Sequence, residues 1–224
     1  GLTPRAWKHG VMRHGSRIWR RRYYDVFSHF YDRFIALHAR KDESGTRAFL
    51  VKQAGLDGVK GPRVLDVCCG TGAVLSAFAE LDAGGIFIGC DFSHGMLVAA
   101  RQKYPAGRVR FVQGNAARLP FEDNAFHAVG CSHALYELKG QDRPMALNEM
   151  KRVVREDGVV LIMEHEVPTH PLIRMMFRLR LLTMGAADAR EFVASGLKPF
   201  QQVFPSVTLS HTPSGKSKLI CCRK

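Results

Sequence analysis

Gly70 and Gly72 mark a short loop between an apolar run, residues 64–67, and a segment of helical periodicity, residues 73–80. Glycine has no Cβ, so the backbone can turn sharply there and a ligand can approach the N–H groups at the helix start. Such a loop accommodates an anion or a nucleoside, although a bare G-x-G pattern also serves tight turns for purely structural reasons. Leu75 stands where a dinucleotide site has a third small residue, which argues against NAD.

Asp91 ends the apolar run of residues 86–90 and lies 19 residues after Gly72. A carboxylate about 20 residues after a glycine loop can accept hydrogen bonds from both hydroxyls of a ribose, and it disfavours a 2′-phosphate. The alternative is that Asp91 only caps the following helix, whose first turn would begin at Ser93. Because the glycine loop precedes it, we expect the ribose role.

A third polar segment, residues 111–121, contains the pattern N-A-x-x-L-P-F. The glycine loop, Asp91 with Met96 five residues later, and this segment together resemble the class I S-adenosylmethionine-dependent methyltransferases. Among them the chain is most similar to the type 11 group, the ubiquinone/menaquinone C-methyltransferase-like enzymes. The resemblance covers residues 63–164, including the helix and turn at residues 149–158. It implies S-adenosylmethionine as the cofactor and S-adenosylhomocysteine as the product.

The same resemblance implies how the methionine and the ribose of the cofactor are held. Asp66 matches the acid near the methionine amino group, and Gly70 and Gly72 match the loop around the methionine and the ribose. Asp91 matches the carboxylate that binds the ribose. These matches predict that the carboxyl ends of the first two strands form one half of the cofactor site.

For the adenine, the resemblance implies contacts from the next two segments. Phe92 and Met96 match the walls of the adenine site, and Ala116 would offer its backbone N–H to the ring. Asn115 matches the residue that contacts the adenine amino group, and its side-chain oxygen can accept that hydrogen bond. The residues expected to line the cofactor site are Asp66, Cys68, Gly70, Gly72, Asp91, Phe92, Met96, Asn115, Ala116 and Ser132.

Methyl transfer from a sulfonium is an in-line displacement, so a base is needed only where the acceptor must lose a proton. In open α/β sheets the reacting groups gather at the carboxyl ends of the strands. His133 and Tyr136 follow the fourth apolar run, whereas His165 follows the fifth, between Glu164 and Glu166. We expect catalytic roles for His133 first, then for His165, and for Tyr136. The alternative is that either imidazole only satisfies loop backbone groups.

Five short apolar runs, each followed by a segment compatible with a helix, predict the framework that positions these residues. Their alternation with helices is typical of a parallel sheet, whereas residues 203–209 and 218–222, across a Pro-Ser-Gly turn, predict a hairpin. The expected fold class is therefore α/β: a Rossmann-like doubly wound, mostly parallel sheet with a C-terminal antiparallel hairpin and N-terminal helices near residues 17–42 and 44–55. The five runs span residues 64–67, 86–90, 109–112, 125–131 and 159–163.

The chain divides by composition near Pro62. We expect a basic N-terminal arm and helical cap over residues 1–60, and a class I methyltransferase domain over residues 61–224. The 224 residues are enough for one sizeable core with appended helices.

A formal net charge of +13 is concentrated in two stretches without acidic residues, 1–24 and 167–187, where Lys and Arg alternate with large apolar side chains. Basic amphipathic helices suit anionic membrane surfaces and hydrophobic substrates, so we expect membrane contact through residues 1–22 or 169–185. The alternative is a solvated basic face on a helix that packs over the core.

The expected acceptor is a small hydrophobic molecule, quinone-like or lipid. An RNA methyltransferase is the alternative that the net charge suggests, but the sequence contains no recognisable RNA-binding module, so nucleic acid is not the expected partner. A further alternative is a regulatory domain that binds the cofactor without catalysis. The sequence leaves the oligomeric state open.

The six cysteines show neither a C-x-x-C pattern nor a Cys/His spacing suited to zinc, so we expect reduced thiols and no metal site. The apolar runs are far shorter than the ~20 residues that a bilayer crossing needs. The expected localisation is cytoplasmic, with peripheral contact to a membrane.

Overall fold

The computed structural model describes residues 43–80, 84–104, 107, 109–166, 191–192, 194–215 and 217–224. The predicted helix near residues 17–42 and the basic segments 1–22 and 169–185 lie outside these ranges. Within the described ranges, no helix is long and apolar enough to cross a membrane.

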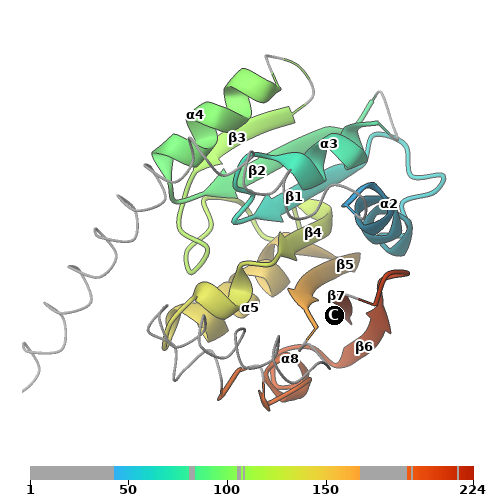
Figure 1. Ribbon diagram of the computed structural model, residues 1–224, viewed down its shortest axis with the longest axis vertical. Helices are drawn as coiled ribbons and strands as arrows, with labels where there is room; N and C mark the ends of the chain where they lie inside the picture. Colours follow the sequence, from blue (N-terminus) through green and yellow to red (C-terminus); the bar gives the residue numbers. More distant parts are fainter. Residues whose placement is uncertain are drawn as a thin grey trace, which may run out of the picture.

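Seven strands form one sheet in the order β3-β2-β1-β4-β5-β7-β6 (Figure 1). β1 to β5 pair in parallel, whereas β7 runs antiparallel between β5 and β6. The predicted α/β class and the mostly parallel sheet with a C-terminal hairpin are confirmed. The strands are Arg63–Val67 (β1), Ile86–Asp91 (β2), Val109–Gln113 (β3), Phe126–Ser132 (β4), Val154–His165 (β5), Ser206–His211 (β6) and Ser217–Arg223 (β7).

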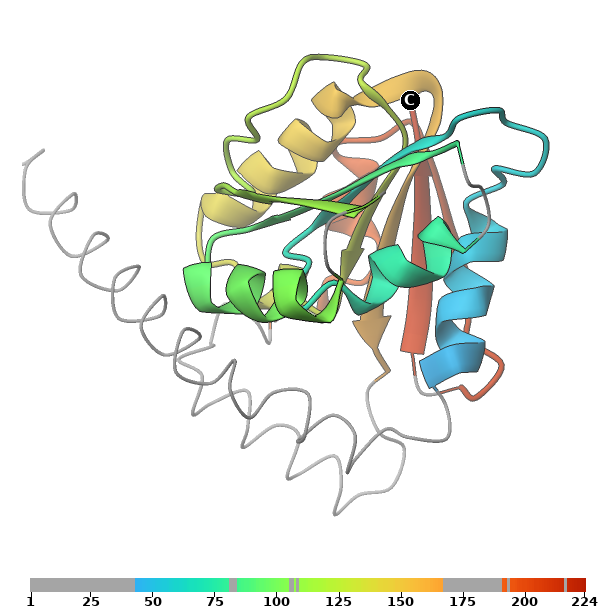
Figure 2. The ribbon, with the colours of Figure 1, turned by 90° about the horizontal axis from the view of Figure 1, so that it is seen from above.

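Helices cover both faces of the sheet (Figure 2). On one face, Leu75 of α3 and Leu97 of α4 belong to a buried cluster that also includes residues of α2. On the other face, Leu147 of α5 and Phe200 of α8 belong to a second buried cluster. The helices whose bounds lie within the described ranges are α2 (Glu43–Gln53), α3 (Ala73–Ala79), α4 (His94–Lys103), α5 (Asp142–Val153) and α8 (Lys198–Gln201), with a 3-10 helix, η2, at Leu135–Glu137.

α2 packs into the same core as the sheet. Its Leu50 and Val51 are buried in one cluster with Val64 of β1 and Leu161 of β5. The division of the chain at residue 60 stays a prediction, but this helix shares apolar contacts with the strands that follow it.

The expected start of the hairpin at residue 203 is wrong. The rings of Phe200 and Phe204 are buried, and the N–H of Phe204 donates to the carbonyl of Phe200 at 2.8 Å. The apolar residues here therefore close a turn against the core, and β6 begins only at Ser206. β5 begins earlier than expected, at Val154, which pairs with Phe126 before a register shift.

The chain adds β2 and β3 on one side of β1 and then β4 and β5 on the other side, so the strand order switches direction between β1 and β4. Such a switch point leaves a crevice at the carboxyl ends of the two strands. Asp66 near the end of β1 is in register with Gly89 of β2 and Gly130 of β4. A buried acid thus lies between two neighbours that have no side chains.

Candidate active site

The loop after β1 turns through three residues with left-handed φ values: Cys68 at 58°, Gly70 at 52° and Gly72 at 81°. The N–H of Cys69 donates to the carbonyl of Cys90 at 3.2 Å, and the N–H of Gly72 donates to the carbonyl of Cys69 at 2.9 Å. Gly72 precedes α3 directly, and a Cβ there would lie 2.8 Å from Cζ of Phe111. The positive φ therefore favours glycine at Gly72, and any side chain there would also require the Phe111 ring to shift.

Asp91 ties the glycine loop to the start of α4. One carboxylate oxygen accepts from the N–H of Gly70 at 2.9 Å, and the other accepts from the N–H of Ser93 at 2.9 Å. The helix cap itself is Ser93, whose hydroxyl accepts from the N–H of Met96 at 3.2 Å. Each carboxylate oxygen has a second lone pair, so these bonds leave Asp91 able to accept from a ribose.

Of the two acids near the glycine loop, Asp66 is more deeply buried than Asp91, with 3% of its surface exposed. Its Oδ1 lies close to Gly130, where an added Cβ would be 3.3 Å away, and has no hydrogen-bond partner among the described residues. Burial, together with repulsion from the Asp91 carboxylate, raises the pKa of Asp66 to about 7. A buried acceptor without a partner is costly, and a bound cation would relieve that cost.

The residues expected around the adenine follow β2 and β3. Phe92 is partly exposed, and its carbonyl accepts from Nε2 of Gln113 at 3.0 Å, whereas Met96 is buried. The side-chain oxygen of Asn115 accepts from the N–H of Ala117 at 3.0 Å, and Ala116 is buried. Because an amide oxygen has two lone pairs, Asn115 retains one for a ligand.

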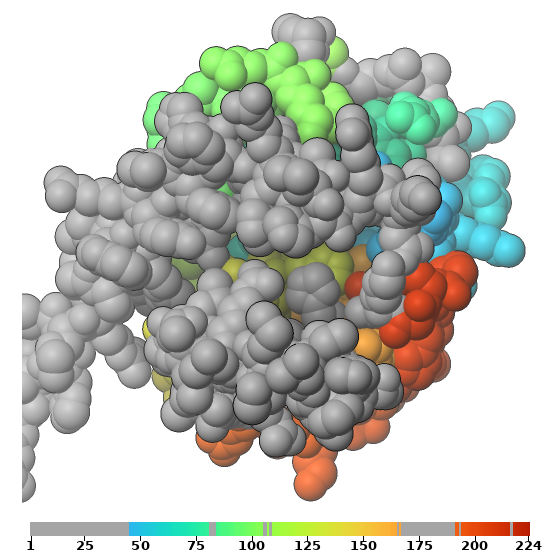
Figure 3. Space-filling model, in the orientation of Figure 1, coloured from blue at the N-terminus to red at the C-terminus, as the bar shows by residue number. Residues whose placement is uncertain are grey.

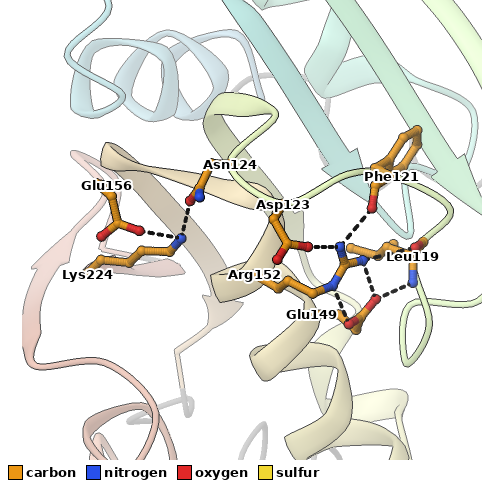
Figure 4. A network of polar contacts seen from close by, with 8 residues as sticks. All are labelled: Leu119, Phe121, Asp123, Asn124, Glu149, Arg152, Glu156 and Lys224. Carbon is orange, nitrogen blue, oxygen red and sulfur yellow. Dashed lines mark hydrogen bonds and ion pairs between the residues drawn. The ribbon is translucent and has the colours of Figure 1, made fainter.

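Helix α5 holds the segment that follows Asn115 (Figure 4). Glu149 accepts from the N–H of Leu119 at 2.7 Å, and the Arg152 guanidinium donates to the carbonyls of Leu119 and Phe121 at 3.1 and 2.8 Å. Hydrogen bonding to Arg152 lowers the pKa of Glu149, so this acid stays ionised. We assigned no role to either residue from the sequence, because their partners are backbone groups about 30 positions away.

The segment after β4 carries the expected catalytic residues. His133 has a left-handed φ of 54°, which is uncommon for a residue with a Cβ, and its N–H donates to the carbonyl of Met163 at 2.7 Å. Oγ of Ser132 is buried without a partner among the described residues, and Tyr136 lies in η2. The backbone of His165 pairs with Ser217, but its side chain lies outside the described part.

The ends of β4 and β5 are neighbours, so the structure brings the backbones of His133 and His165 to the same edge of the sheet. In the space-filling view, yellow and orange atoms of this region lie beside the red hairpin (Figure 3).

Within the described ranges, no three His, Cys, Asp or Glu side chains form a cluster suited to a metal ion.

Glu164, one residue before His165, is only 5% exposed. Burial raises its pKa to about 8, despite attraction from Lys218. Two buried carboxyl groups with raised pKa values, Asp66 and Glu164, therefore lie at the carboxyl ends of β1 and β5. Such perturbed groups gather at functional sites more often than elsewhere.

Comparison with known proteins agrees with this fold. A family model described as a methyltransferase domain matches residues 64–158. A TehB-like S-adenosylmethionine-dependent methyltransferase from Corynebacterium glutamicum superposes with a TM-score of 0.61 at 17% identity, over 89% of this chain and 98% of that one. The PH0226 protein from Pyrococcus horikoshii superposes with a TM-score of 0.58 at 18% sequence identity, over 87% of this chain and 98% of that one. Residues 64–158 are thus similar to a methyltransferase domain, and the fold of the chain is similar to that of solved S-adenosylmethionine-dependent methyltransferases.

The family resemblance is also supported by sequence identity. The demethylmenaquinone methyltransferase of Staphylococcus aureus is 34% identical over 160 residues, which make up 70% of this chain and 65% of that protein. The match thus spans slightly less than two thirds of the relative. The resemblance inferred from the glycine loop, Asp91 and the segment after β3 is confirmed.

The raised pKa values predict how stability depends on pH. Both acids bind protons more tightly in the folded than in the unfolded chain, so their stabilising contribution is full below pH 4 and is lost as pH rises through 7 to 8. Urea unfolding between pH 4 and 9 should show that the parent chain loses about 4 kcal/mol or more of unfolding free energy, a loss that the double variant Asp66→Asn, Glu164→Gln lacks. If the free energy of unfolding changed with pH in the same way in the parent chain and the double variant, the raised pKa values of the two acids would be contradicted.

Proposed function

We propose that this chain transfers a methyl group from S-adenosylmethionine to a small hydrophobic acceptor, quinone-like or lipid. The observation that carries the cofactor part is the buried Asp66 carboxyl, which has an oxygen without a partner in the described residues and lies at the switch point of the sheet. The acceptor class is supported by the 34% identity to a demethylmenaquinone methyltransferase.

The residues present fit each part of the cofactor. Asp66 can take the amino group of the methionine moiety, because an ammonium favours the ionised form of a buried acid. The loop at Gly70 and Gly72 presents backbone without side chains, and Asp91 can accept from the ribose hydroxyls. Asn115 and Ala116, held by the α5 contacts on the following segment, can meet the adenine.

When bound, S-adenosylmethionine supplies a methyl group on a sulfonium, which reacts without further activation by the protein. The chain then contributes orientation and, where the acceptor carries a proton, a base. His133 is the candidate for that base because it directly follows β4, next to the switch point, with its backbone fixed by Met163. His165 at the end of β5 and Tyr136 in η2 are the further candidates.

The membrane part of the proposal rests on the sequence. Residues 1–22 and 169–185 combine Lys and Arg with apolar side chains, which suits the surface from which a lipid-soluble acceptor would be taken. RNA remains the outcome that would replace a hydrophobic acceptor, since the net charge of +13 also attracts polyanions.

Cofactor choice can be tested by calorimetric titration with S-adenosylhomocysteine and, separately, NAD. We expect binding of the first alone, and Asp91→Ala should weaken it by roughly 1–3 kcal/mol because hydrogen bonds to a charged group are lost. The matched control is Asp157→Ala, an exposed acid near the amino-terminal end of β5 that pairs with Arg155, which should leave the affinity unchanged. Equal binding of NAD would overturn the cofactor assignment.

The acceptor and the base can be tested together. Methyl incorporation into quinols, lipids, small amines and RNA should favour the quinols or lipids, and for such an acceptor His133→Gln should slow the chemical step by about 10²–10⁴. His127→Gln is the control, because His127 lies at the other end of β4 and accepts from the N–H of Arg63. Full activity of His133→Gln, or methylation of RNA alone, would refute the corresponding part of the proposal.

A further inference from the structure

The short helix η2 is held at its carbonyl end by one buried arginine. Arg143, 6% exposed, donates from Nε to the carbonyl of Leu135 at 3.2 Å, and from one terminal nitrogen to those of Tyr136 and Leu138 at 3.2 and 2.5 Å. Its guanidinium also lies 4.2 Å from the centre of the Phe192 ring. Three hydrogen bonds from one planar, permanently charged group fix the carbonyl side of this turn.

A buried carboxyl group lies at the opposite end of η2. The backbone N–H groups of Leu135 and Tyr136 act on Glu164 to lower its pKa against the effect of burial, and its Oε1 is buried without a hydrogen-bond partner among the described residues. A carboxyl group therefore lies on the N–H side of this turn and a guanidinium on its carbonyl side. The other groups that act on Glu164 are Lys218 of β7, which attracts its charge, and Glu137 of η2, which repels it.

Arg143 and Glu164 both lie beside the segment that carries the expected catalytic residues. Met163, the residue before Glu164, accepts the N–H of His133, whose left-handed φ must be maintained by its surroundings. Consecutive residues of β5 therefore fix the backbone of His133 and the start of η2. Arg143, from the first turn of α5, fixes the end of the same segment.

We propose that Glu164 and Arg143 are positioning residues that hold η2, and with it His133 and Tyr136, in the orientation that the acceptor side of the site requires. The inference rests on the proposed methyl transfer. The hydrogen bonds of Arg143 described above end on residues 135–138, after β4, whereas the glycine loop follows β1, so cofactor binding and acceptor chemistry should respond separately to replacement of Arg143 and Glu164.

The test compares Glu164→Ala, Glu164→Gln and Arg143→Met in the full chain. Glutamine is a close mimic, because the pKa of about 8 leaves Glu164 largely protonated at pH 7, and the amide oxygen of glutamine can accept from the same backbone N–H groups. Lys224→Met is the control: the side chain of Lys224 is 12% exposed and donates to Asn124 and Glu156 at 2.5 and 3.2 Å (Figure 4). These two partners lie near the amino-terminal ends of β4 and β5, whereas η2 follows the carboxyl end of β4.

The first measurement is amide hydrogen exchange at residues 133–138, with S-adenosylhomocysteine as the ligand probe. In Glu164→Ala and Arg143→Met, exchange should be about tenfold faster or more, because buried hydrogen bonds to a charged or strongly polar group are lost. The affinity for S-adenosylhomocysteine should stay within about twofold. Unchanged exchange, or an affinity that falls in parallel with faster exchange, would overturn the proposal.

The second measurement is methyl transfer to a short-chain demethylmenaquinol. We expect kcat to fall by about 10²-fold in Glu164→Ala, with the KM for S-adenosylmethionine unchanged, and Glu164→Gln to recover most of the loss. If Glu164→Gln lowered kcat as much as Glu164→Ala does, positioning by hydrogen bonds would be contradicted. If the parent chain forms no product, the proposal of a quinone-like acceptor is refuted. The rate of amide exchange then still decides whether Glu164 and Arg143 hold η2.

Discussion

The site depends on one constraint, the burial of the Asp66 carboxyl at the place where the sheet changes its direction of growth. Gly130 on the neighbouring strand leaves room for this group, and burial with repulsion from Asp91 keeps its pKa near 7. The cost of a buried acid without a partner is tolerable in a site that receives a cation. The glycine loop that follows β1 is held by the hydrogen bond from Gly70 to Asp91, the same carboxylate that repels Asp66.

Helix α5 organises the rest of the crevice from one face of the sheet. Its first turn provides Arg143, which fixes the segment after β4, and its last two turns provide Glu149 and Arg152, which fix the segment after β3. One helix thereby sets both the expected adenine side and the expected acceptor side. The polar contacts compensate backbone groups that the two irregular segments would otherwise leave unpaired.

The sequence predicts the fold well because its strongest signals are local. Apolar runs separated by helical periodicity, and glycines followed by Asp91 at a fixed distance, need no knowledge of distant contacts. Arg143, Glu149 and Arg152 escaped prediction because their partners are carbonyl and N–H groups that only the folded chain brings near. The misplaced start of β6 has the same origin: Phe204 is apolar because it packs against the core, not because it lies in a strand.

The most direct test of this account is the number of protons released when S-adenosylhomocysteine binds. Titrations at pH 6 in two buffers of different ionisation enthalpy should show release approaching one proton, because an ammonium beside Asp66 ionises a carboxyl whose pKa is about 7 in the free protein. Affinity should rise with pH up to about 8, and Asp66→Asn should abolish both effects, whereas Glu164→Gln should preserve them. Binding by the parent chain without proton release would contradict the central role of Asp66.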